Sequence, residues 1–596
     1  MNEQKLEQKV EHMKNNMRHT LAHLLAAAVL QHYPHARCTI GPAIDNGFYY
    51  DFDFSAGDMP CDVDLKRIEK TMRDILPTWQ TFTSKKVSAE RARELFADNP
   101  YKLELIKEIV ERDKPITLYT VGGFTDLCRG GHAELPNVEI KKDAFALTSI
   151  AGAYWRGDET KPMLTRIYGL AFSYKDDLDA HLRQQEEAKK RDHRKLGKEL
   201  DLFATSELVG SGLPLFTPKG TILRDEINDF SQGLRLARGF QKVWIPHITK
   251  NDLYKISGHW DKFGHELFLV KSQETKDQFV LKPMNCPHHQ QIYVSRPRSY
   301  RDLPIRYMST TEVYRDEKTG ELGGLSRVRA ITQDDSHIFC TVDQIESEYQ
   351  SIMEMVVEFY RVMGMKFRAR LSFRNPEEPE KYLGDEKLWD RAQEQLENIA
   401  KKSSFEYFIA PGEAAFYGPK IDFMAMDAIG REFQLATAQL DFVQPARFEL
   451  AYADSDGKDK MPVMIHLAIA GSLERFLSVY IEHTAGNFPL WLSPVQATVL
   501  PIGEKHAAFA REVFEALKEA GIRAEFDDRN ETLGKKIRDW KLAKSPYALV
   551  VGDKEVESKQ VTVESRDNGT QGQTDIAGLI ERLREEIKTK QANALH

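Results

Sequence analysis

The sequence predicts a multidomain protein built from α+β and α/β units. The chain has 596 residues, which is more than a single hydrophobic core organises. From residue 493 onward, strand and helix patterns alternate, which predicts a small α/β domain with a mostly parallel sheet. Residues 12 to 169 instead combine an apolar helix with short alternating strands, which is typical of a self-contained α+β domain.

Composition narrows the class of protein. With 41% hydrophobic and 29% charged residues, the chain is typical of a globular protein. The formal net charge of −8 argues against a protein whose whole surface binds nucleic acid. A net charge for the whole chain can still conceal basic patches on part of the surface. The apolar stretch Leu21–Leu30 is shorter than the ~20 residues that span a bilayer. Five widely separated cysteines favour a reducing compartment, so we expect a cytoplasmic protein that spans no membrane.

In the N-terminal unit, apolar spacing predicts a helix over Met17–Leu30, and alternation predicts a strand over Phe48–Phe52. A charged helix over Lys175–Glu199 follows, and we interpret it as a connector because it has no wide apolar stripe. Its basic run Lys189–Lys195 comes shortly after two glutamates at salt-bridge spacing. We therefore interpret the run as an exposed, salt-bridged face.

A long helix opens the central block, where apolar residues from Leu223 to Leu234 recur at helical spacing. The helix is expected to end near Gly239, and Val243–Pro246 is expected to form a strand. The C-terminal unit is expected to contain strands at 497–502, 523–526 and 547–552 and helices at 504–520 and 533–544. The predicted domain bounds are 1–170, 171–199, 200–492 and 493–596.

Two pairs of metal-ligating side chains occur at a spacing of four residues in the N-terminal unit. His19 and His23 share one face of the predicted helix, and Cys128 and His132 supply a second such pair. On bare chemistry, the cluster suggests zinc. A solvated or core histidine pair is the alternative for His19 and His23 taken alone, and the second pair makes that alternative less favoured.

Three short strings in the central block occur in the order of the three motifs of class II aminoacyl-tRNA synthetases. The long helix ending at Pro246 resembles motif 1, and Gly471–Phe476 resembles motif 3. Tyr314–Glu317, followed by the glycine-rich stretch Gly320–Gly324 and then Arg327, resembles motif 2. The resemblance implies an antiparallel-sheet catalytic domain with an ATP site and, through motif 1, a homodimer.

In such an enzyme an amino-acid carboxylate attacks the α-phosphate of ATP, which is bound with Mg²⁺, so fixed cations are needed where charge develops. The resemblance implies that Arg315 bridges the α-phosphate and the carboxylate and that Glu317 reads the adenine amino group. It implies that Arg327 and Arg475 hold the distal phosphates, with Ser472 in the same site. Each arginine alone would suggest a surface ion pair, but the combined pattern favours ATP binding.

Longer strings narrow the resemblance to threonyl-tRNA synthetases; they are Lys282–Pro287, Thr332–His337 and Pro462–His466. The resemblance implies one zinc ion per subunit, held by Cys286, His337 and His466. Three protein ligands leave one tetrahedral position open, as in working zinc sites. Threonine would offer its amine and hydroxyl to the metal, whereas valine has no hydroxyl. An apolar pocket would separate such isosteres by only ~10²-fold.

The family places further polar residues near this zinc; the matching residues here are Gln333, Asp335, Tyr417, Lys420, Gln434 and Gln439. His259 matches a histidine linked with the tRNA transfer step, and histidine accepts a proton near neutral pH. The chain departs from the family at Ile331, where an adenine-stacking phenylalanine is usual, and at Leu467, where arginine is usual. Around Gln434, the replacements are Phe433, Leu435 and Ala436.

The histidine and cysteine pairs also resemble the editing domain of bacterial threonyl-tRNA synthetases, in which Lys102 and Asp126 match residues of the same pocket. The resemblance implies that these side chains position water and substrate, generally without a required metal. Serine also carries an amine and a hydroxyl, so zinc cannot fully exclude it. A second site that hydrolyses seryl-tRNA(Thr) is therefore expected.

Phe526–Asn530 and Val550–Glu555 resemble the anticodon-binding domain shared by several class II enzymes. Asn530 and Glu555 match base-reading positions, and Arg566 is a candidate for a third contact. The implied macromolecular partner is tRNA(Thr). The small ubiquitin-like domain that usually precedes the editing domain is expected to be missing and to be dispensable for charging.

The expected function is threonine–tRNA ligation with editing, and two alternatives stay open. One is a synthetase-like protein that binds RNA as a regulator without charging it, an alternative supported by Ile331 and Leu467. The other is a hydrolase that mainly clears mischarged tRNA and has a weak central domain. Intact Arg315, Arg475 and zinc ligands argue against the first.

Overall fold

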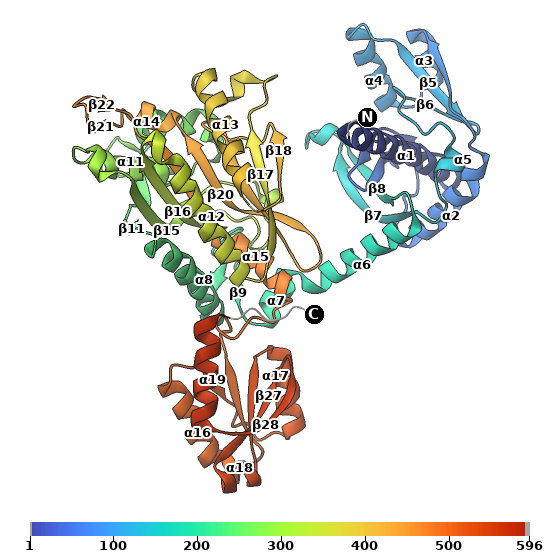
Figure 1. The fold of residues 1–596 in the computed structure, drawn as a ribbon. Helices are drawn as coiled ribbons and strands as arrows, with labels where there is room; N and C mark the ends of the chain where they lie inside the picture. The colour runs from blue at the N-terminus through green and yellow to red at the C-terminus, as the bar shows by residue number, and fades with distance from the viewer. Residues whose placement is uncertain (1–2, 404, 591–596) are drawn as a thin grey trace. The chain divides into compact units, whose positions relative to one another are not determined.

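A computed structural model describes residues 3–403 and 405–590 of the chain (Figure 1). The chain divides into two compact units, Met1–Glu186 and Glu187–His596. Among the described residues, no helix combines the length and the apolar character needed to cross a bilayer.

The first unit is built on a five-stranded antiparallel sheet with the order β1-β3-β8-β7, in which β2 pairs with β3. Its strands are β1 (Arg37–Cys38), β2 (Ala43–Ile44), β3 (Gly47–Asp53), β7 (Phe145–Tyr154) and β8 (Met163–Ala171). Helices α1 (Glu3–His32) and α2 (Leu65–Ile75) pack on it and share its core. The predicted helix and the predicted strand lie within α1 and β3, and both predictions are confirmed.

A smaller three-stranded sheet completes this unit. Its strands are β4 (Thr83–Val87), β5 (Ile116–Val121) and β6 (Phe124–Leu127), accompanied by helices α3 (Ala89–Leu95), α4 (Pro100–Glu111) and α5 (Pro136–Glu139). After β6, the segment Cys128–His132 is a loop, with Gly130 and Gly131 at φ +97° and +82°. Cys128 and His132 therefore do not lie on a helix, because the two left-handed glycines turn the chain between them.

The connector differs from the prediction of one exposed helix. It consists of α6 (Lys175–Arg191) and α7 (His193–Glu199), which are separated at Asp192. The Asp192 side chain accepts the N–H of Arg194 and so caps α7. The basic run is not simply solvated, because His193 is buried at the start of α7.

The second unit contains an eight-stranded sheet with the order β11-β15-β16-β23-β20-β19-β17-β18. Its strands are β11 (Gln241–Lys242), β15 (Ile305–Tyr314), β16 (Ala330–Cys340), β17 (Lys366–Phe373), β18 (Tyr407–Pro411), β19 (Lys420–Met426), β20 (Glu432–Asp441) and β23 (Val463–Ser472). The two edge pairings are parallel and the inner ones antiparallel. This agrees with the predicted antiparallel-sheet catalytic domain.

The core of this unit lies between the sheet and the helices α8 (Pro218–Leu236), α12 (Ile345–Val362), α13 (Glu386–Lys402) and α15 (Leu473–Thr484) (Figure 1). Helix α8 begins with Thr217 as N-cap and Pro218 at its first position, which are favourable starting residues. The opposite face of the sheet is flanked by α9 (Asp252–Ser257), α10 (His259–Phe263) and α11 (Cys286–Val294), and by the small sheet of β12 (Ile248–Lys250), β13 (Leu269–Lys271) and β14 (Gln278–Leu281).

The strand predicted over Val243–Pro246 is displaced. The structure has β11 over Gln241–Lys242, parallel to β15, and only the N–H of Val243 extends the pairing, to Met308 O at 3.0 Å. Pro246 has no N–H to donate, so the ladder cannot continue through it.

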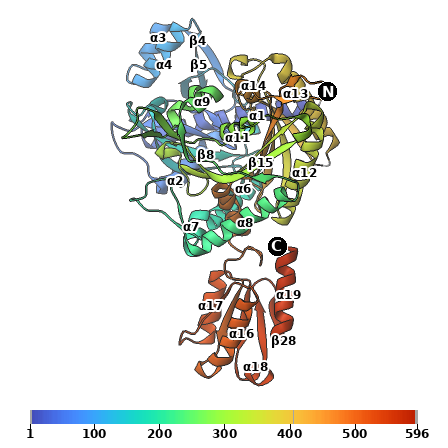
Figure 2. The same ribbon diagram turned by 90° about the vertical axis from the view of Figure 1, so that its left-hand side faces the viewer.

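The C-terminal part carries a five-stranded sheet with the order β25-β24-β26-β27-β28. The elements are β24 (Ala497–Pro501), α16 (Ala507–Glu519), β25 (Ala524–Phe526), α17 (Leu533–Ala543), β26 (Tyr547–Val551), α18 (Asp553–Ser558), β27 (Gln560–Ser565), β28 (Gly569–Asp575) and α19 (Ile576–Thr589). Val499 packs with α16 and α19, whereas the next residue, Leu500, packs with Trp540 of α17. The sheet is thus covered on both faces (Figure 2). It is mixed rather than mostly parallel, because β27 and β28 run antiparallel.

Candidate active site

Strand register brings the predicted catalytic residues together on one face of the eight-stranded sheet. Cross-strand partners form one row, which runs Lys420, Gln439, His466, His337, Tyr307. The neighbouring row runs Asp422, Thr437, Ala468, Asp335, Ser309. Side chains of directly opposed residues point to the same face of a sheet. Residues from four distant parts of the sequence therefore share one surface.

This surface lines a cavity of about 610 Å³. The predicted residues around it are Arg315, Glu317, Arg327, Gln333, Asp335, His337, Tyr417, Lys420, Gln434, Gln439, His466, Ser472 and Arg475. Ile331, Leu435 and Leu467, at which the chain departs from the family pattern, line the same cavity. His259 lines an adjoining cavity of about 390 Å³, which shares Arg315 and Tyr417 with the first.

Cys286, His337 and His466 can hold a metal ion. Their ligand atoms lie within 4.8 Å of one another, and Nε2 of His337 lies 3.0 Å from Nδ1 of His466. Tetrahedral Zn–N bonds of ~2.0–2.1 Å place two nitrogens a little over 3 Å apart, so the spacing fits. Burial lowers the pKa of His337 well below its ordinary value, which keeps the ring neutral, as metal ligation requires.

Each histidine of this cluster is oriented through its other ring nitrogen. His466 Nε2 lies 2.8 Å from Asp441 Oδ2, and His337 Nδ1 lies 2.8 Å from Nδ1 of His289. Such outer partners hold the ligand ring and its tautomer in place. The sequence reasoning missed both residues. A signal existed for Asp441, because it stands two residues after Gln439 on the same strand and therefore on the same face.

The polar wall of the cavity is organised by Asp422, which the sequence reasoning also missed. This buried carboxylate lies 2.8 Å from Lys420 Nζ and accepts hydrogen bonds from Gln434 Nε2 at 2.7 Å and from Thr437 Oγ1 at 2.9 Å. Lys420 and Gln434 are therefore held against the sheet.

Cationic residues gather at the other end of the cavity. Arg475 lies in the first turn of α15, whose N-cap, Ser472, accepts the Arg475 N–H through its Oγ at 3.2 Å. Loss of hydration in the cavity, and then the charge of Arg327, lower the pKa of Arg475. A polyanion between the two guanidinium groups would relieve this repulsion. Arg327 pairs with Glu317, with Nε 2.9 Å from Oε2.

His259, at the start of α10, is buried. Its Nδ1 forms a hydrogen bond with the hydroxyl of Ser257, and the two atoms lie 2.8 Å apart. Burial, and then the charges of His466 and Arg315, lower the pKa of His259 to about 3. The ring is therefore neutral at physiological pH and its affinity for a proton is low in this state.

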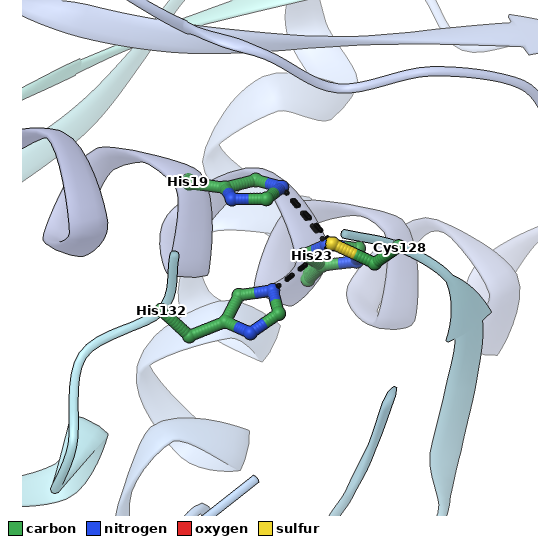
Figure 3. A group of neighbouring side chains, drawn as sticks. All are labelled: His19, His23, Cys128 and His132. Atoms are coloured by element: carbon green, nitrogen blue, oxygen red, sulfur yellow. Dashed lines mark hydrogen bonds between the residues drawn. The ribbon is translucent and has the colours of Figure 1, made fainter. Parts of the chain in front are cut away.

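In the N-terminal unit the four predicted side chains point toward one another (Figure 3). Cys128 Sγ lies 3.6 Å from His19 Nε2 and 3.4 Å from His132 Nε2, and the Nε2 atoms of His19 and His23 lie 3.2 Å apart. These ligand atoms lie within 4.8 Å of one another, so the cluster is a second candidate metal site. Burial raises the pKa of Cys128, but hydrogen bonds from His132, His19 and His23 outweigh it and lower that pKa to about 3.

A buried ion pair adjoins this cluster. Lys102 Nζ lies 2.5 Å from Asp126 Oδ1, and Tyr50 donates to Asp126 Oδ2 at 2.6 Å. His23 Nδ1 lies 3.4 Å from the same oxygen. Burial would lower the pKa of His23, but its partners Asp126 and Cys128 raise it to about 9. His19, His23, Lys102, Asp126 and Cys128 line a cavity of about 540 Å³, to which Tyr50 also belongs.

The predicted anticodon residues are not equally accessible. Asn530 is exposed. Glu555 is 7% exposed, and its oxygens accept from the Gly552 N–H and the Thr562 hydroxyl. Arg566 donates to the carbonyls of Lys544 and Phe488 at 2.8 and 3.0 Å. Glu555 and Arg566 thus make contacts within the fold, and Asn530 is the most exposed of the three.

Two family models match the chain. The model of the family described as "tRNA synthetase class II core domain (G, H, P, S and T)" matches residues 268–484. The model of the family described as "Anticodon binding domain" matches residues 496–586. The sheet, its cavity and these matches define a class II aminoacyl-tRNA synthetase.

The chain is 47% identical to the threonine--tRNA ligase of Porphyromonas gingivalis, over 94% of its own length and 86% of that protein. It is 46% identical to the Thermotoga maritima threonine--tRNA ligase, over 95% and 87% of the two chains. It belongs to the threonine--tRNA ligase family.

Solved structures of threonyl-tRNA synthetases resemble this chain as well. The RNA binding domain of threonyl-tRNA synthetase from Cryptosporidium parvum is 38% identical and superposes with a TM-score of 0.63 over 66% of this chain and 98% of that one. A putative threonyl-tRNA synthetase from Aeropyrum pernix is 27% identical, with a TM-score of 0.60 over 67% and 97%.

Proposed function

We propose that this protein activates threonine with ATP and transfers it to the 3′ end of tRNA(Thr). The observation that supports this function best is the common cavity of the metal-ligand cluster and the arginine cluster. One end suits an amine and a hydroxyl, and the other suits a triphosphate. A reaction between threonine and ATP needs both ends within one site.

In the proposed reaction, the threonine carboxylate oxygen attacks the α-phosphorus of ATP, a P–O bond forms, and pyrophosphate leaves. Arg315 neutralises the two like charges that approach one another, while Arg327 and Arg475 stabilise the departing pyrophosphate. Glu317 would accept a hydrogen bond from the adenine amino group when Arg327 binds the phosphates.

Residues on the sheet select and orient the amino acid. Zinc, when bound by Cys286, His337 and His466, would hold the amine and the hydroxyl of threonine. Gln439, whose amide donates to Gly418 O at 3.0 Å, and Tyr417 enclose the side-chain end of the site. Asp335, held by Asn285 Nδ2 at 3.0 Å, supplies an acceptor for the substrate amine, and Gln333 extends this polar wall.

In the second step, the terminal ribose hydroxyl of the tRNA attacks the threonyl carbonyl and AMP leaves. His259 is proposed to accept a hydrogen bond from that hydroxyl, because the ring is neutral and borders the same site. Lys420 and Gln434, which Asp422 immobilises, are proposed to stabilise the bound adenylate.

The N-terminal cavity is proposed to hydrolyse seryl-tRNA(Thr). It contains a thiolate, a cluster of imidazoles and a buried lysine–carboxylate pair within one hollow of about 540 Å³. Such a set of donors and acceptors can position a water molecule and polarise an ester. A pocket that excludes the threonine methyl would remove serine selectively.

The remaining expectations are proposals that rest on family membership. They are an editing domain over 1–170, a linker over 171–199, a catalytic domain over 200–492, an anticodon-binding domain over 493–596, one zinc ion per subunit, Mg²⁺ with ATP, a homodimer and a cytoplasmic location. Asn530, Glu555 and Arg566 are the proposed base contacts, and Asn530 is the most exposed of them.

Threonine-dependent ATP–pyrophosphate exchange by the purified chain tests the activation step. We expect exchange with threonine, weaker exchange with serine and none with valine, and we expect chelation of zinc to abolish it. Absence of exchange in zinc-replete protein would favour the non-charging regulator instead. For editing, we expect His23→Ala and His132→Ala to lose seryl-tRNA(Thr) hydrolysis while they retain charging.

A further inference from the structure

His193 contacts the loop that carries Arg327 and the helix that carries Arg475. It is the first residue of α7 and is 6% exposed. Its Nδ1 lies 2.7 Å from Glu482 Oε1, near the end of α15, which carries Arg475 in its first turn. Its Nε2 lies 3.1 Å from the main-chain nitrogen of Leu325, two residues before Arg327.

These two contacts define the tautomer of His193. A main-chain N–H can only donate, so Nε2 of His193 must accept from Leu325 and carry no proton. The proton of the neutral ring then lies on Nδ1 and is donated to the Glu482 carboxylate. Glu482 is itself held in place, because it also accepts from the His193 N–H at 3.1 Å and lies 2.6 Å from Arg431 Nη2.

The fit between His193 and the loop is close. Gly324 adopts φ +57°, and a Cβ atom there would lie 2.3 Å from His193 Nε2. Leu325 is fully buried in the core of the unit. The loop therefore has no room to move toward the ring, and the hydrogen bond opposes movement away from it.

Asp192, His193 and Glu482 also lie close enough together to hold a metal ion, but their bonds favour another role. Asp192 accepts the Arg194 N–H at 2.8 Å as the cap of α7. Both ring nitrogens of His193 already have partners. The cluster is accordingly a hydrogen-bonded junction rather than a ligand set.

We propose that His193 is a positioning residue of the ATP site, which ties the loop that carries Arg327 to the helix that carries Arg475. It acts through the main chain of Leu325 and does not touch ATP. Because His193 begins the second connector helix, the connector is a structural part of the ATP site. The inference rests on the proposed activation of threonine with ATP.

Two substitutions of His193 test the roles of its two ring nitrogens separately. The amide nitrogen of asparagine replaces Nδ1, so His193→Asn keeps a donor toward Glu482 and loses the acceptor for Leu325. The amide oxygen of glutamine reaches the position of Nε2, so His193→Gln keeps that acceptor. One such hydrogen bond contributes ~0.5–1.5 kcal/mol, which corresponds to about a two- to tenfold effect.

In threonine-dependent ATP–pyrophosphate exchange, we expect His193→Asn to raise KM for ATP by about two- to tenfold and to leave KM for threonine unchanged. His193→Gln should stay near the wild-type value, because the main-chain N–H of residue 193 still donates to Glu482. His181→Asn is the matched control in the first connector helix, where His181 Nε2 contacts Gln185. Equal effects of the Asn and Gln variants, or an equal rise in both KM values, would overturn the proposal.

Hydrogen exchange of the Leu325 amide in substrate-free protein provides a readout that needs no activity. We expect faster exchange in His193→Asn than in wild type or His193→Gln. If wild-type protein failed to activate threonine while this pattern held, the proposed function would be wrong and the anchoring of the loop would stand. Unchanged exchange in His193→Asn would refute the anchoring itself.

Discussion

His337 and His466 are 129 residues apart in the sequence, yet Nε2 of one lies 3.0 Å from Nδ1 of the other. They are direct cross-strand partners on β16 and β23. Cys286, at the start of α11, completes the cluster. The candidate metal site is therefore a product of strand register, and its residues are held by partners that their own sequence strings do not reveal.

Asp441 should control the affinity of this site for zinc. Asp441→Asn keeps all three ligands but removes the carboxylate 2.8 Å from His466 Nε2. We expect zinc affinity to fall by about 10- to 100-fold, as measured by competition with a chromophoric chelator. Asp459→Asn, in the exposed strand β22 (Asp459–Lys460), is the control and should bind zinc as wild type does. Unchanged affinity of Asp441→Asn would contradict the role.

Cys128 should react as a thiolate at acidic pH. Because its pKa is lowered to about 3, the reactive form persists down to that pH. In a Cys61→Ser background, we expect the rate of Cys128 alkylation by iodoacetamide to change little between pH 8 and pH 5. An ordinary thiol with a pKa of ~8.5 slows about tenfold per pH unit over this range.

His132→Gln should restore part of the ordinary pH dependence, since it removes a hydrogen bond to the sulfur. Mass spectrometry of the peptide that contains Cys128 measures both rates. A tenfold fall per pH unit in the parent protein would show that the imidazoles do not stabilise the thiolate.

Lys102 and Asp126 should stabilise the first unit only as a pair. Lys102→Met removes the closer of the two cations beside the buried Asp126 carboxylate and leaves only His23, and we expect a loss of about 3 kcal/mol in the free energy of unfolding. Lys102→Met with Asp126→Asn should recover part of that loss. Urea unfolding of the whole chain, followed through hydrogen exchange of peptides from α1 and α4, measures it.

Lys107→Met is the control for this pair, because Lys107 lies on the same helix, is exposed and faces Glu111 at 3.9 Å. A surface pair of this kind contributes about 0–1 kcal/mol. A similar effect of Lys102→Met and Lys107→Met would mean that the buried pair has no special importance.

Ile331 should limit the affinity for ATP. It lines the cavity on β16, opposite Val313, at the position where the family usually carries an adenine-stacking phenylalanine. Stacking of a base on an aromatic ring contributes about 1–3 kcal/mol. We expect Ile331→Phe to lower KM for ATP about fivefold or more in pyrophosphate exchange and to leave KM for threonine unchanged. A higher KM for ATP would show that the cavity has no room for the ring.

Several features could be predicted from the sequence because they depend on neighbouring residues. The helical period within Met17–Leu30 and the alternation in Phe48–Phe52 are local patterns, and both elements formed as expected. The metal ligands lie in long specific strings. The displaced strand near Val243 and the break at Asp192 were not predicted. Pro246 lacks an N–H, and Asp192 caps a helix; each is an effect of a single residue that a hydrophobic period does not reveal.

The partners of the site residues could not be predicted in this way. Asp422, Asp441 and His289 act on residues of other strands or helices, at sequence separations that no period describes. The sequence placed Glu555 at a base-reading position but could not show that its two oxygens also accept hydrogen bonds from Gly552 and Thr562.

By itself, the sequence determined the family, the order of the domains and the chemical types available at each site. Only the tertiary structure decided which of these groups meet. Lys420, Gln439, His466 and His337 form one row because antiparallel register aligns four strands. His193 reaches Leu325 because the connector packs against the core of the unit. Hydrogen bonds and desolvation act over a few ångströms of space, whatever the separation along the chain.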